Sequence, residues 1–157
     1  MNAVLCLSLA AAFIVVTPAA HASHYLIADV PDVIQKNYHA KLAAAGIHDT
    51  KALFGAIATK KARRDLAKKV GVMYATLTKW ATFIDLMRVD GIGPKMVRLL
   101  NASDVKHLKS FVEQDAAALH PRMRQANRGG RYSEVVPGVE VVRSWIQRAQ
   151  SLPIILQ

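Results

Sequence analysis

The chain has 157 residues, of which 52% are hydrophobic, and this size fits one domain with a modest core. Its 21 lysines and arginines against 11 acidic residues give a formal net charge of +10. This excess favours polyanionic partners such as nucleic acid, anionic lipid or acidic envelope polymers. A single cysteine, Cys6, excludes a fold held by disulfide bonds.

The first 22 residues are typical of a secretory signal. Ala3 to Val16 is almost unbroken apolar sequence, and Ala20-His21-Ala22 provides the small residues of a signal-peptidase site before Ser23. No Lys or Arg precedes the apolar run, so an uncleaved anchor is the alternative, although the run is shorter than the roughly 20 residues that a spanning helix needs. We expect a cleaved signal over 1–22, an exported domain (periplasmic or secreted) over 23–157, and no stable membrane span after cleavage.

After Ser23 the sequence predicts short helices joined by tight turns, because no sustained alternation of β-branched residues favours a sheet. The predicted helices, in chain order, are one through Tyr38, Leu42 and Ala45 that stops at Gly46, one through Leu53, Phe54 and Ile57, one over 60–70, one over 76–89, one over 95–100, one through Val105, Leu108, Phe111 and Val112, one over about 115–127, and one through Val139, Val142, Ile146 and Ala149. Their apolar residues recur at helical spacing, most clearly over 76–89.

Residues that favour helix ends mark the boundaries of several of these helices. Gly46 and Gly71 are suited to the position just after a helix. The side chains predicted to cap helix N-termini are, in chain order, Asp49 or Thr50, Thr59, and Ser103 or Asp104.

The turn Gly91-Ile92-Gly93-Pro94 lies between two predicted helices, and the second of these is basic. Helix, glycine turn and basic helix is the arrangement of a helix-hairpin-helix phosphate clamp. Glycines let the backbone approach a ligand closely, and amides at a helix N-terminus face an anion. The predicted nucleic-acid contacts of this turn are Gly91, Ile92, Gly93, Lys95 and Arg98. The alternative is architectural, because Pro94 suits the first turn of a helix and such turns also pack helices without a ligand.

A second candidate surface is the segment 60–69, which has six cations and one acid. On a helix Lys60, Arg64 and Lys68 lie on one face at i, i+4 and i+8, and Lys61 lies beside them. Like charges at this spacing cost a few tenths of a kcal/mol per pair unless a polyanion faces them. We expect these four residues to support nucleic-acid binding, with a merely solvated charged face as the alternative. A third cluster, in a basic arm or an ordinary loop, consists of Arg122, Arg124, Arg128 and Arg131.

Residues that could carry catalysis are scattered. The histidines show no ligand spacing, and no metalloprotease, phosphate-loop or nucleophile-elbow motif occurs. The acidic residues form no pair suited to acid–base work or to a metal ion. Trp80 and Trp145 fall within apolar stripes, so we expect them in the core. The sequence therefore predicts a protein without enzymatic activity, cofactor, metal or small-molecule substrate.

A weak internal repeat relates Val30–Gln35 to Val89–Pro94. The first copy has no glycine, and Asp32 within it would repel a phosphate. We therefore expect only the second hairpin to contact one.

Three runs, Lys61–Val72, Leu77–Trp80 and Asp85–Gly93, resemble the bacterial domain-of-unknown-function family 4332 with its tandem helix-hairpin-helix units, and the similarity continues to Ala149. This resemblance implies an all-α fold of two such units, with no established activity or catalytic residues. The chain departs from the family pattern in its glycine-free first hairpin and in a shortened second unit around Ala102-Ser103.

Together these features predict a compact all-α bundle of short helices, built from two helix-hairpin-helix units of which the first is degenerate. The predicted function is that of an exported, non-enzymatic binding module that contacts DNA or another polyanion through its phosphate backbone, without sequence specificity. The alternative is a cell-envelope scaffold for a protein partner, which uses the helix-hairpin-helix fold structurally.

Overall fold

The computed structural model describes residues 24–156, and the predicted signal segment over 1–22 lies outside them. Within this part the chain is all helical, with one isolated bridge between Leu26 and Asp49, so the predicted all-α class is confirmed. The α-helices are α1 His39–Ala44, α2 Thr50–Ile57, α3 Lys60–Val70, α4 Tyr74–Met87, α5 Pro94–Ala102, α6 Leu108–Val112, α7 Ala116–Ala126 and α8 Val139–Gln150; short 3-10 helices are η1 Ile27–Asp29, η2 Lys36–Tyr38 and η3 Arg128–Gly130.

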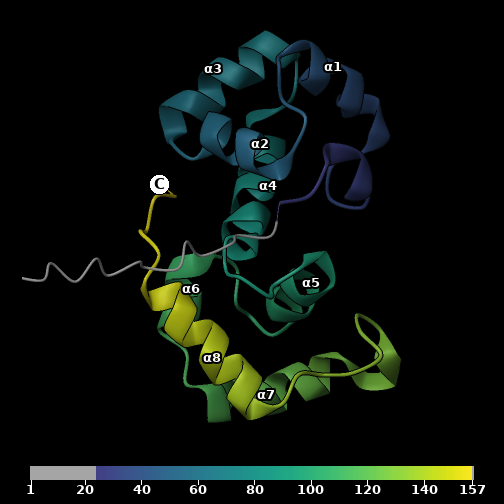
Figure 1. The fold of residues 1–157 in the computed structure, drawn as a ribbon. Coiled ribbons are helices and arrows are strands. Elements are labelled where there is room, and N and C mark those ends of the chain that lie inside the picture. The colour runs from purple at the N-terminus through teal and green to yellow at the C-terminus, as the bar shows by residue number, and fades with distance from the viewer. Residues whose placement is uncertain (1–23, 157) are drawn as a thin grey trace, which may run out of the picture.

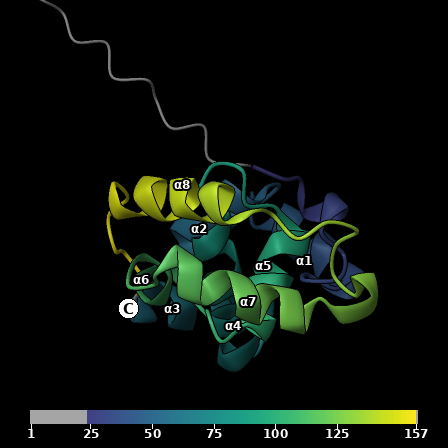
Figure 2. The same cartoon turned by 90° about the horizontal axis from the view of Figure 1, so that it is seen from below.

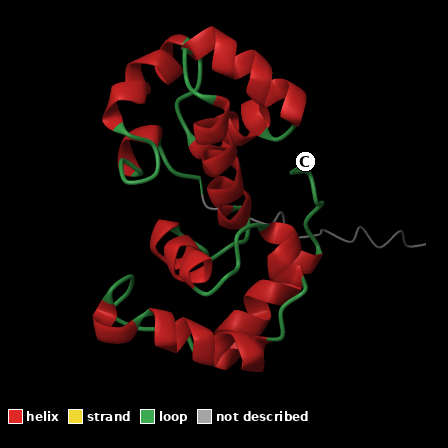
Figure 3. Ribbon diagram, turned by 180° about the vertical axis from the view of Figure 1, so that it is seen from behind, coloured by secondary structure: helices red, strands yellow, loops and turns green. Residues whose placement is uncertain are grey.

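The described residues bury two hydrophobic clusters, and α4 runs from one into the other (Figures 1 and 3). The first unit comprises η1 to α3 and the start of α4, where Leu77 and Trp80 face its core. The second unit comprises the end of α4 and α5 to α8, and Leu86 and Met87 face its core. Seen from below, α8 lies across α7 and α6 (Figure 2), and these helices are in contact. Among the described residues, none of the helices is long and apolar enough to cross a membrane.

Most of the predicted helix ends are observed. Asp49, one of the two residues considered, caps α2 by accepting the Ala52 amide at 2.7 Å. Thr59 caps α3 by accepting the Ala62 amide at 3.1 Å. Gly71 ends α3 with φ +64°, a left-handed conformation that glycine adopts without steric cost.

The predicted start of the sixth helix is wrong. Ser103 and Asp104 lie in a turn, and α6 begins only at Leu108, where His107 Nδ1 accepts the Ser110 amide at 3.1 Å. Asp104 has φ +64°, which ends the preceding helix rather than starting a new one. Histidine is not a usual cap, so the pattern of preferred capping residues misplaced this boundary.

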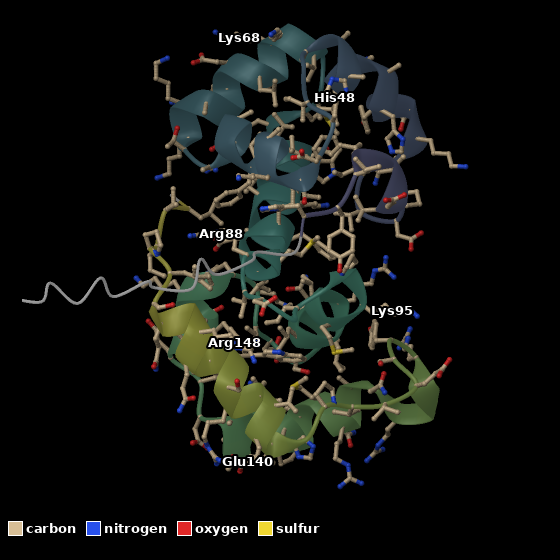
Figure 4. The ribbon with its side chains drawn as sticks, in the orientation of Figure 1. His48, Lys68, Arg88, Lys95, Glu140 and Arg148 are labelled. Atoms are coloured by element: carbon tan, nitrogen blue, oxygen red, sulfur yellow. The ribbon has the colours of Figure 1, made fainter. Side chains whose placement is uncertain are left out.

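A buried charged pair lies at the joint between the two units. Asp85 accepts Arg88 Nη1 at 2.8 Å through one oxygen and the Leu108 amide at 3.0 Å through the other. Arg88 also donates to the carbonyl of Pro153 at 2.9 Å, and its guanidinium lies 5.1 Å from the centre of the Phe54 ring (Figure 4). Because these contacts reach α2, α6 and the C-terminal tail, they fix the two units against each other.

Candidate anion-binding surfaces

The hairpin between α4 and α5 is closed by its own backbone. The Ile92 amide donates to the Val89 carbonyl at 3.0 Å, and the Ile92 side chain is 0% exposed. Gly91 has φ +88°. Ile92, one of the predicted contacts, therefore has neither a side chain nor an amide available to a phosphate.

Neighbouring side chains lie close to both glycines of the hairpin, although Gly91 itself is exposed. A Cβ atom at Gly91 would lie 2.7 Å from Nε1 of Trp145, and one at Gly93 would lie 2.8 Å from the hydroxyl oxygen of Tyr25. Contacts this short leave no room for any side chain. The glycines therefore let α8 and the N-terminal segment approach the hairpin, which is the packing role.

An arginine of α8 also holds the hairpin. Arg148 Nη1 donates to the Asp90 carbonyl at 2.7 Å and lies 3.4 Å from the Asp90 carboxylate (Figure 4). Its other terminal nitrogen donates to Ser144 Oγ at 2.8 Å. The protein itself thus supplies the cation at this turn.

Carboxylates lie beside the predicted cations of the second helix. Arg98 forms an ion pair with Asp32 at 2.7 Å, and a depression of about 380 Å³ at the N-terminus of α5 is lined by Asp29 and Asp32 as well as by Lys95 and Arg98. Lys95 is exposed and makes no ion pair within residues 24–156. Of the two predicted cations of the hairpin, Arg98 is therefore paired with a carboxylate, and Lys95 lines the same depression as two carboxylates.

The cations on α3 are in a different state. Lys60, Arg64 and Lys68 are exposed, and none of the three makes an ion pair with another described residue. Lys61, by contrast, forms an ion pair with Asp65 at 2.7 Å. Its hydrogen bond and charge lower the pKa of Asp65 below the ordinary value. We call the exposed surface formed by Lys60, Arg64 and Lys68 the α3 basic face.

Arg63, which the sequence counted among the cations of this segment, is buried. Its side chain is 2% exposed, and Nη1 donates to the carbonyls of Ile57 at 2.6 Å and Ala58 at 3.0 Å. It therefore satisfies backbone carbonyls at the end of α2, where a cation is also favoured by the helix dipole. The guanidinium lies 5.7 Å from the centre of the Tyr74 ring.

The two predicted surfaces lie apart. Lys68 stands at the outer edge of the first unit, whereas Lys95 stands on the second unit (Figure 4). The hairpin and the α3 basic face therefore lie on different units and form two separate candidate surfaces.

The other residues that the sequence analysis considered have contacts or burial that suit a structural role. In the third cluster, Arg122 donates to the Ser103 carbonyl at 3.0 Å and to the Gln114 side chain. The core positions predicted for Trp80 and Trp145 are confirmed, at 2% and 6% exposed. No three His, Cys, Asp or Glu residues of the described part are arranged to hold a metal ion.

Comparison with known proteins gives the family. Residues 32–152 match the family described as Domain of unknown function (DUF4332). The chain belongs to this family. No curated protein and no solved structure matches it.

The DUF4332 match runs from the turn at Asp32 to the end of α8, and so includes the first unit except η1 and the whole second unit. It therefore includes the hairpin with its neighbouring residue Trp145 and also the α3 basic face. Tyr25, which lies against Gly93, is outside the matched range.

Proposed function

We propose that this DUF4332 chain is a non-enzymatic binding module that holds a polyanion by charge, and that its contact surface is the α3 basic face. The observation that supports this proposal is a contrast on one helix. Lys61 forms an ion pair with a carboxylate, whereas Lys60, Arg64 and Lys68 form none among the described residues and are exposed.

Local energetics favour a partner for this face. Cations at i, i+4 and i+8 repel one another, by a few tenths of a kcal/mol per neighbouring pair. The net charge of +10 adds to this repulsion. A row of phosphates opposite the three residues would relieve it and would require no sequence specificity.

The Gly91 hairpin has a different role in this proposal. We infer that the flanking helices form a helix-hairpin-helix unit whose glycines serve packing, since Trp145 and Tyr25 lie where side chains at these two positions would stand. The turn at Val30 is its degenerate counterpart: there the amides of Val33 and Ile34 donate to the Val30 carbonyl, much as Ile92 donates to Val89. Lys95 is then the predicted hairpin cation that makes no ion pair among the described residues.

Export of the domain belongs to the same proposal. The apolar run and the small residues before Ser23 support a secretory signal, and in an exported protein the polyanion would be an envelope or extracellular one. The mass of the protein recovered from the periplasm or medium tests this point. A chain beginning at Ser23 would support export, and a full-length cytoplasmic product would contradict it.

A matched pair of triple variants tests the binding surface. The first replaces Lys60, Arg64 and Lys68 with alanine, and the second replaces the exposed Arg124, Arg128 and Arg131. Both remove three positive charges. With a fluorescent DNA duplex as the probe polyanion, we expect the first variant to bind about tenfold more weakly or worse at low salt, and the second to bind much nearer to the parent. Equal losses in the two variants would show that net charge alone matters and would refute the assigned surface.

A rigid adaptor for a protein partner is the alternative, and the hairpin favours it, because its glycines let Trp145 and Tyr25 pack closely against the turn. A pull-down from envelope extract with nuclease present separates the two functions. A stoichiometric protein partner retained by the Lys60, Arg64 and Lys68 alanine variant would favour the adaptor.

A further inference from the structure

Two exposed apolar side chains lie where α3 turns into α4. Met73 is 71% exposed and Tyr74, the first residue of α4, is 37% exposed, although both lie next to a well-packed core. Met73 is the N-cap of α4, the longest helix described, and forms no side-chain hydrogen bond there. Ser, Thr, Asp or Asn at this position would stabilise the helix. The fold therefore does not account for a methionine in this place.

Tyr74 joins this turn to the α3 basic face. Its ring lies beside the Arg63 guanidinium. Its pKa is lowered chiefly by a hydrogen bond from Arg63, and the charge of Arg64 adds to the effect. The ring therefore lies beside Arg63, the residue that directly precedes Arg64 of the α3 basic face.

The C-terminal tail brings further apolar surface to the same region. Ile154 and Ile155 are 49% and 39% exposed. Ile154 lines a cavity of about 300 Å³ together with Arg63 and with Thr78, which lies one turn after Tyr74 on α4. The ribbon shows the C-terminal end beside the first unit, near α2 and α3 (Figure 1). Through Arg63, the tail lies on the same unit as Tyr74 and the α3 basic face.

We propose that this combined surface docks onto an anionic lipid membrane, with Lys60, Arg64 and Lys68 on the lipid phosphates and with Met73 and Tyr74 in the interface. The inference rests on the proposed function and names its polyanion. A nucleic-acid backbone would interact with the cations only and would leave Met73 and the tail isoleucines in water. A membrane surface uses both kinds of group, since interfacial binding combines buried apolar area with attraction to anionic lipids. Each cation near such a surface strengthens binding by about fivefold.

Site-specific fluorescence tests the inference in the full chain. In a Cys6→Ser background, Met73→Cys provides one thiol for an environment-sensitive fluorophore. The matched control is Val135→Cys, because Val135 is 73% exposed and lies in the loop before α8. With vesicles of phosphatidylglycerol and phosphatidylcholine in equal parts, we expect a blue shift and a gain in intensity at position 73 and neither at position 135. The apolar N-terminal segment is present in both variants and so cannot produce the difference.

A second variant separates insertion from stability. Met73→Ser supplies a good N-cap, so helix stability should be maintained or raised. It also removes the apolar side chain, so we expect vesicle affinity to fall about five- to tenfold. Unchanged affinity for the anionic vesicles would overturn the inference.

The remaining outcomes distinguish the inference from the proposed function. Binding to anionic vesicles without a fluorescence shift at position 73 would mean that the protein adsorbs by charge through the α3 basic face. That result would refute the insertion of Met73. An equal shift on vesicles of phosphatidylcholine alone would also overturn the inference, because anionic lipid would then have no part. Binding to the DNA duplex but not to the vesicles would refute membrane docking and would leave the proposed polyanion binding intact. Binding to neither would refute both.

Discussion

Replacing Gly91 with alanine tests whether the hairpin glycine serves packing. The backbone at Gly91 has φ +88°, and the new Cβ atom would lie 2.7 Å from Nε1 of the buried Trp145. A left-handed backbone costs an L-residue about 1–2 kcal/mol. Displacing a packed indole adds about 1–3 kcal/mol. We therefore expect Gly91→Ala to lower the free energy of unfolding by about 2–5 kcal/mol.

Gly46 provides a matched control for this measurement. It has φ +80°, and no heavy atom lies within 4 Å of the position that its Cβ would take. Gly46→Ala should therefore show only the backbone cost. Urea titrations followed by helical circular dichroism measure both variants, and a Trp145→Ala background should remove the excess cost at Gly91. Equal losses for Gly91→Ala and Gly46→Ala would refute the packing role of the hairpin glycine.

Three smaller predictions concern charged groups. Asp85→Ala removes the acceptor of Arg88 Nη1 and of the Leu108 amide, while Arg88 keeps its bond to the Pro153 carbonyl, so we expect urea titration to show a loss of about 3 kcal/mol; a loss near zero would mean that this pair does not hold the joint. A double-mutant cycle on Asp32 and Arg98 should give a coupling of about 0–1 kcal/mol that weakens with salt, and a large, salt-independent coupling would contradict an exposed pair. Lys61→Ala should raise the pKa of Asp65 toward its ordinary value in an NMR titration, and an unchanged pKa would disprove the pairing. Because the pKa of Asp65 is lowered by folding, the contribution of this pair is present at neutral pH and is lost as the solution is acidified through that pKa.

Local signals in the sequence predicted most of the helices. Thr59 and Gly71 bound α3 in the structure as the sequence indicated, because capping depends on a few neighbouring residues. The start of α6 was misplaced, since the helix begins with an unusual histidine cap. Short-range chemistry therefore suffices for a helix end that uses a preferred capping residue.

The state of the candidate site depends on long-range contacts that a single sequence does not display. Tyr25 and Trp145 lie far along the chain from the hairpin glycines that they approach, and Asp32 reaches Arg98 across 66 positions. The burial of Arg63 did have a signal. It shares the stripe of Leu66 and Val70 at i, i+3 and i+7, but its charge suggested exposure.

The proposed membrane surface was also outside the reach of sequence patterns. Met73 is a single apolar residue in a turn, and only its exposure beside Tyr74 and the α3 basic face makes it unusual. An exposed residue of this kind cannot be told from a core residue until the packing around it is known.

The salt dependence of binding tests the central claim most directly. The logarithm of the affinity for a DNA duplex is measured against the logarithm of salt concentration for the parent chain, for the Lys60, Arg64 and Lys68 alanine variant, and for Lys95→Ala. We expect the slope to fall by about one unit for each cation removed from the α3 basic face, and to stay close to the parent value for Lys95→Ala. A slope reduced by Lys95→Ala but unchanged by the α3 substitutions would return the binding site to the hairpin and contradict this account.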